Sequence, residues 1–103
     1  MAEEMELQER LRRLQEDAAR LEEKQKTLEQ DLADVEHQTR RASDRAERGE
    51  NSPELDSVQS QLTERRELNL RDQRDTSRAV ESLRTEREDL EEWLRQMRGD
   101  TDR

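Results

Sequence analysis

The 103 residues leave room for one domain, and only 26% of them are hydrophobic whereas 48% are charged. These values exclude a globular core of large aromatic side chains, since Trp93 is the only aromatic residue, and they fit either a disordered chain or long helices. The net charge of −9 argues against nucleic acid or an anionic membrane as a partner, and the absence of Cys excludes disulfides.

The first residues, MAEEMELQER, are acidic and lack the basic start and apolar run of a signal peptide. No apolar run approaches the ~20 residues that span a bilayer, so we expect a cytoplasmic protein without a membrane partner. Acidic residues are abundant, and Lys24 and Lys26 are the only lysines. This composition is halophile-like, although GC-rich coding would also favour Arg over Lys.

The first predicted helix covers about residues 3–48. An apolar residue recurs every seven positions from Leu7 to Ala42, and a second series, apolar except at Gln25 and Thr39, follows four residues later in each repeat. This a/d pattern is typical of a left-handed coiled coil. The residues of this arm predicted to form the oligomer interface are Leu7, Leu11, Leu14, Leu21, Leu28, Leu32 and Val35.

A turn is predicted at residues 49–52. Gly49 accepts the left-handed conformation that ends a helix, Ser52 can cap the next helix, and Pro53 suits the first helical position. A linker of about four residues is normal between two packed helices. One long helix kinked near Pro53 is the alternative.

The second predicted helix covers about residues 53–98, followed by a frayed tail at 99–103. Its seven-residue repeat is weaker in the middle, where Asn69 and Thr76 occupy seam positions and Leu68 and Leu70 lie off the stripe. Buried polar seam residues commonly determine register and oligomeric state. The residues of this arm predicted to form the oligomer interface are Leu55, Leu62, Val80, Leu83, Leu90, Trp93 and Leu94.

The two repeats are in phase for an all-α, antiparallel helical hairpin (coiled coil). If the chain turns near residue 50, facing seam residues have numbers that sum to a constant, and Leu7 with Leu94 or Ala46 with Leu55 both give 101. The same register places flanking acidic residues close together, with Asp17 near Glu86 and Asp31 near Asp72. Flanking charges therefore do not decide the register.

We expect the hairpin to pair with a second copy as a homodimer, forming a four-helix bundle. The seam leucines at 14, 28 and 32 would face Arg87, Gln73 and Asn69, and a second copy could cover them. Trp93 lies at a g position beside this seam, where it either widens the apolar face or stacks with Arg10. A longer parallel assembly of opened chains is the alternative.

No pattern of catalytic, cofactor or metal-binding residues is evident. His37 is the only His and has no second ligand four residues away, so we expect it to be solvated. The densest carboxylates, at 88, 89, 91 and 92, lie on an exposed helix face, which does not separate their pKa values as catalysis requires. We therefore expect no enzyme activity, no cofactor and no metal.

The predicted function is a non-catalytic, self-associating scaffold or adaptor with a further protein partner. The two-arm layout is similar to that of prefoldin subunits, whose helices hold unfolded clients at their tips. Prefoldin subunits carry β-hairpins between the arms, for which residues 49–52 leave no space. A holdase-type chaperone that contacts clients along or at the tips of its arms is the alternative function.

Overall fold

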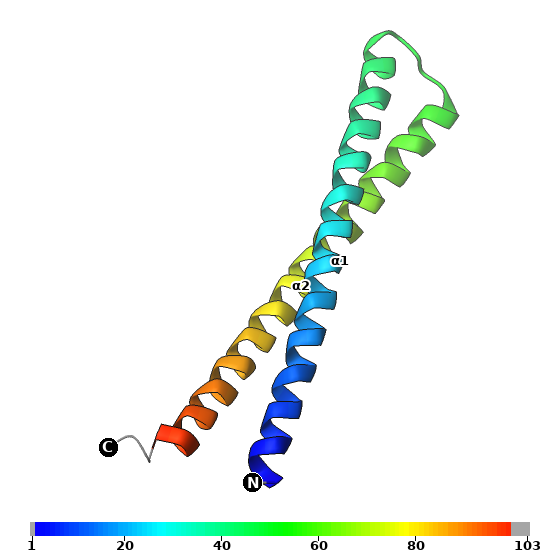
Figure 1. Ribbon diagram of the computed structural model, residues 1–103. Helices are drawn as coiled ribbons and strands as arrows, with labels where there is room; N and C mark the ends of the chain where they lie inside the picture. Colours follow the sequence, from blue (N-terminus) through cyan, green and yellow to red (C-terminus); the bar gives the residue numbers. More distant parts are fainter. Residues whose placement is uncertain (1, 100–103) are drawn as a thin grey trace. The chain divides into compact units, whose positions relative to one another are not determined.

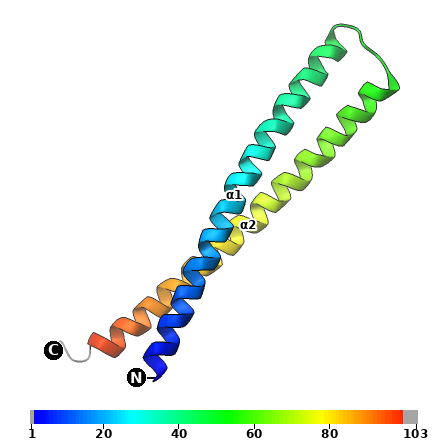
Figure 2. The ribbon, with the colours of Figure 1, turned by 45° about the vertical axis from the view of Figure 1, so that its right-hand side comes forward.

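A computed structural model describes residues 2–99 as two long helices joined by a short turn. Helix α1 spans Ala2–Glu47 and helix α2 spans Pro53–Gly99, and residues 2–99 contain no strand. The two helices run in opposite directions (Figures 1 and 2). The predicted all-α helical hairpin is confirmed, and the alternative of one kinked helix is wrong.

The helix ends lie within one residue of the ends expected from the sequence, which is the usual uncertainty of a helix boundary. The predicted frayed tail begins at Gly99, which the structure places as the last residue of α2. Residues 100–103 of that predicted tail lie outside the described residues.

Contacts divide the chain into two compact units, which we describe separately. The turn unit consists of Gln25–Asp75 and includes the connection between the helices, coloured green in Figure 1. The terminal unit consists, among the described residues, of 2–24 and 76–99. Each unit contains one segment of α1 and one segment of α2.

In the turn unit, α1 ends in a Schellman motif. Gly49 has a φ of +92° and donates its N–H to the Ala46 carbonyl at 3.0 Å, while the Glu50 N–H donates to the Arg45 carbonyl at 3.1 Å. These two bonds satisfy carbonyls that the last helical turn would otherwise leave without donors. The Arg45 Nε also donates to a Glu50 carboxylate oxygen at 2.7 Å, so the side chains reinforce the same closure.

Helix α2 begins with the cap that the sequence predicted. The Ser52 Oγ accepts the N–H of Leu55 at 3.1 Å, and the Ser52 carbonyl accepts the N–H of Asp56 at 3.1 Å. Pro53 takes the first helical position, where its missing N–H is not needed. Glu54 and Asp56 place negative charge at the positive end of the helix dipole.

We expect Gly49→Ala to lower the free energy of unfolding by about 1 kcal/mol, because an L side chain is strained at this positive φ. A Cβ at this position meets nothing within 4 Å, so the loss would report backbone strain alone. Gly99→Ala is the matched control, since that glycine also has open space but lies in α2 without a positive φ. Urea denaturation compares them, and equal effects would contradict the strain argument.

The core of the turn unit is a small apolar cluster in which α1 packs on α2. It contains Val35, which is fully buried, with Ala42, Leu55 and Leu62. Ala46 packs against this cluster, in agreement with the register that pairs it with Leu55. Because these residues occupy a and d positions, the heptad pattern predicted the seam correctly.

At one seam position of the turn unit, a hydrogen-bonded network takes the place of an apolar contact. Asn69 is only 4% exposed, and its Nδ2 donates to the Leu28 carbonyl at 2.9 Å and to Asp31 Oδ2 at 3.1 Å. Gln73 donates to Asn69 Oδ1 at 2.6 Å, and Arg65 donates to Asp31 Oδ1 at 3.0 Å. The buried amide is therefore satisfied on both its atoms, which favours the observed register of the two helices.

In the terminal unit the seam is less completely covered. Leu14, Leu94 and Thr76 are buried, but most other seam residues of this unit are half-buried. Arg87 occupies a seam position, and its Nε is buried without a hydrogen-bond acceptor although it lies 3.7 Å from a Glu91 carboxylate oxygen. An unsatisfied buried donor opposes folding, so this part of the seam is the weaker one.

The flanking charges have partners different from those expected. Glu86 pairs with Arg10 at 3.2 Å in the terminal unit, and in the turn unit Asp31 pairs with Arg65 at 3.0 Å. Both pairs join g positions and have residue numbers that sum to 96, whereas the acidic neighbours expected from the sequence join g positions with a sum of 103. Glu86 and Asp31 therefore each have a basic partner across the seam, and these two pairs favour the hairpin register.

Candidate interaction surface

Every leucine and valine predicted for the oligomer interface is buried or half-buried within the hairpin itself. Five of the fourteen predicted residues are buried: Leu14, Val35, Leu55, Leu62 and Leu94. Eight are half-buried: Leu7, Leu11, Leu21, Leu28, Leu32, Val80, Leu83 and Leu90. Trp93 alone among them is exposed, with 57% of its surface accessible. The seam thus serves the fold, and Trp93 is the one residue of this set that the hairpin leaves exposed.

Trp93 belongs to a row of g positions along α2. Glu86 and Ala79 precede it at seven-residue intervals, which place all three on nearly the same side of the helix. The α1 side of this surface is marked by Arg10, whose Nη2 donates to Glu86 Oε1 at 3.2 Å. We call the surface of the terminal unit formed by Ala79, Glu86, Trp93 and Arg10 the Trp93 face.

A shallow groove between α1 and α2 lies at the Ala79 end of this face. Apolar side chains from both helices contribute to its lining, and charged or polar groups surround them. The lining residues are Asp17, Arg20, Leu21, Lys24, Ala79, Ser82 and Leu83. The groove forms here because Ala79 has a single methyl group where other g positions of the unit carry Glu86 or Trp93.

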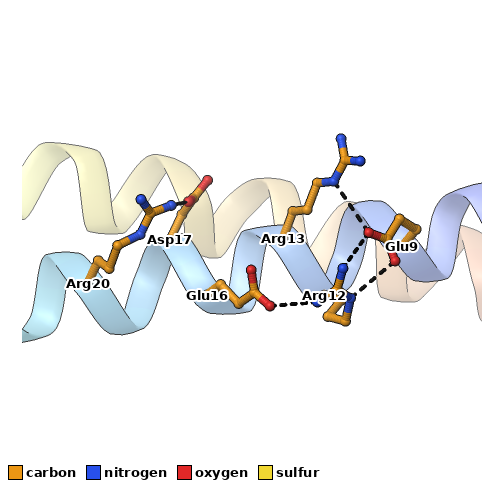
Figure 3. A network of polar contacts seen from close by, with 6 residues as sticks. All are labelled: Glu9, Arg12, Arg13, Glu16, Asp17 and Arg20. Atoms are coloured by element: carbon orange, nitrogen blue, oxygen red, sulfur yellow. Dashed lines mark hydrogen bonds and ion pairs between the residues drawn. The ribbon is translucent and has the colours of Figure 1, made fainter.

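The neighbouring outer surface of α1 carries a network of ion pairs (Figure 3). Arg12 donates to Glu9 and, at 2.7 Å, to Glu16, while Arg13 lies 3.5 Å from Glu9. The hydrogen bond and positive charge of Arg12 hold the pKa of the Glu9 carboxyl below its usual value, with a smaller contribution from Arg13, although desolvation acts in the opposite direction. These are exposed i,i+3 and i,i+4 pairs on the solvent side of the helix, and such pairs contribute little to stability.

A similar pair lies next to the groove. Arg20 donates to the Asp17 carboxylate (Figure 3). Both residues line the groove. The wall therefore presents a carboxylate that can accept a further hydrogen bond and guanidinium and ammonium groups that can lie against an aromatic ring.

The polar residues singled out in the sequence as candidates for catalysis or metal binding lie on the exposed surface of the two helices. His37 is exposed, as are Glu88, Asp89, Glu91 and Glu92, as expected from their positions. Within residues 2–99, no group of three or more acidic or His side chains is arranged to hold a metal ion. In the same residues, neither helix has an apolar stretch long enough to cross a bilayer.

Comparison of the chain with protein families, with curated proteins and with solved structures finds no significant match.

Sequence reasoning placed Trp93 at a g position beside the seam but did not find the groove. The groove depends on residues from both helices, and Asp17 and Lys24 are brought next to Ala79 only by the pairing of g positions. A signal was present in the sequence, since an Ala between longer side chains in a g row leaves space beside the seam.

Proposed function

We propose that this protein is a non-catalytic, self-associating scaffold or adaptor that acts through its helical hairpin, in the cytoplasm, with a second copy and a further protein as partners. The net charge of −9 and the acidic helix surfaces favour protein partners over nucleic acid.

The observation that carries this proposal is the exposure of Trp93. Exposed tryptophans are uncommon outside interaction sites, and tryptophan is enriched among the residues that dominate binding energy. This side chain is 57% exposed beside a seam that the chain already fills with its own leucines. Its apolar area is therefore available to another molecule without opening the hairpin.

A holdase-type chaperone is the second candidate, favoured by two exposed methionines of the terminal unit. Met5 is 71% exposed and Met97 is 37% exposed. Methionine is flexible and polarizable, and it adapts to partners of different shape. Together with Trp93, these residues could contact unfolded clients near the ends of the arms.

Two measurements on the purified chain separate these functions. Sedimentation equilibrium should show a dimer at micromolar concentration, and affinity purification at the salt concentration of the native host should recover a folded partner at fixed stoichiometry. If the purification recovers no such partner and the chain suppresses the aggregation of a denatured client protein, the holdase function is favoured. A monomer at every concentration would contradict self-association.

A further inference from the structure

We infer that two copies of this chain associate through their Trp93 faces in an antiparallel arrangement, in which Trp93 of each copy enters the Ala79 groove of the other. This inference rests on the proposed self-association and specifies its surface and symmetry.

Trp93 and the Ala79 groove lie at equal distances along α2 on either side of Glu86. Ala79 lies seven residues before Glu86 and Trp93 lies seven residues after it, which is about 10 Å along the helix on each side. A twofold axis that crosses α2 at Glu86 therefore places Trp93 of each copy next to Ala79 of the other, so the same contact forms twice. Such an interface is self-complementary and closed, as in most homodimers.

The chemistry of the groove fits an indole ring. Leu21, Leu83 and Ala79 offer apolar contact to the ring. The indole N–H needs an acceptor when it leaves water, and the Asp17 carboxylate or the Ser82 hydroxyl in the groove wall can provide one. The ring face can in turn receive a cation from the same wall, where Arg20 and Lys24 lie.

The charges at the proposed axis do not by themselves select a second copy. Arg10 and Glu86 already pair within each hairpin at 3.2 Å. On the axis Glu86 of one copy meets Glu86 of the other and Arg10 meets Arg10, and the ion pair within each hairpin partly offsets the repulsion between these like charges. The same axis brings Glu3 towards the partner's Asp17, and Arg20, which donates to Asp17 within its own chain, offsets that repulsion.

The absence of Cys from the sequence allows a direct test of the symmetry by single-cysteine cross-linking. In an antiparallel dimer only residues near the axis meet their own copies, so oxidised Glu86→Cys should form a covalent dimer rapidly. Ala79→Cys should react no faster than Ala19→Cys, an exposed control on α1 of the same unit. Equally rapid cross-linking of Ala79→Cys and Glu86→Cys would show parallel chains and overturn the inference.

A second variant tests the groove. Ala79→Arg fills it, and we expect the dimer dissociation constant to rise about tenfold or more and the Trp93 emission to shift to the red, with helicity by circular dichroism unchanged. Ala19→Arg should alter neither value. If Ala79→Arg unfolds the chain, the cross-linking result decides.

The failures of the two proposals are distinguishable. A wild-type chain that stays monomeric contradicts the proposed self-association and, with it, this surface. A wild-type dimer whose dissociation constant and Trp93 emission do not respond to Ala79→Arg leaves self-association standing and shows that the copies pack through another face.

Discussion

Leu62→Ala should lower the free energy of unfolding by about 2–5 kcal/mol. Leu62 is 4% exposed in the cluster that joins α1 to α2 in the turn unit, and removal of its side chain leaves a cavity beside Val35 and Leu55. The cluster is small, so few neighbours can move to fill the space. Urea denaturation followed by circular dichroism at one fixed chain concentration measures the loss.

Leu68→Ala is the matched control for this prediction. It makes the same chemical change six residues along α2, at a side chain that is 51% exposed and lies off the seam. We expect a change within about 0.5 kcal/mol, as for most surface substitutions. Similar losses for the two variants would show that the turn unit is not held together by this seam.

Trp93→Ala should raise the dimer dissociation constant by a factor of about 30 or more, equivalent to about 2 kcal/mol, if Trp93 anchors the association of two copies. The stability of the isolated hairpin should change little, because the side chain is largely exposed within one chain. Sedimentation equilibrium measures the constant, and Leu68→Ala again serves as the control. An unchanged constant would exclude Trp93 as an anchor.

The helices and the turn could be predicted because their signals are local. A seam of a and d residues requires only the helical period, and the connection is specified by Gly49, Ser52 and Pro53, whose backbone preferences act within a few residues. The Schellman motif at Gly49 and the Ser52 cap both formed as these preferences require.

The middle of the second arm was harder to interpret because its polar seam residues have two physical outcomes. Asn69 could have lain exposed in a loose seam or buried with its amide satisfied. The structure shows the second, since Asn69 bonds the Leu28 carbonyl and Asp31 while Gln73 bonds Asn69. That outcome depends on side-chain geometry across two helices, which periodicity does not encode.

The partners of the flanking charges were missed for a related reason. A sum of 101 describes facing seam residues, whereas the flanking pairs Arg10–Glu86 and Asp31–Arg65 follow a sum of 96. The acidic neighbours named from the sequence also join g residues, with a sum of 103. Both offsets pair g positions across an antiparallel seam, so periodicity alone does not show which one carries the ion pairs.

The central claim, that two hairpins associate with Trp93 at their contact, is tested most directly by Trp93 fluorescence during dilution. Trp93 is the only tryptophan, so its emission reports one environment. We predict blue-shifted emission in the dimer, moving to the red over the same concentration range in which sedimentation shows dissociation. Red emission that does not depend on concentration, from a chain that sediments as a monomer throughout, would contradict the claim.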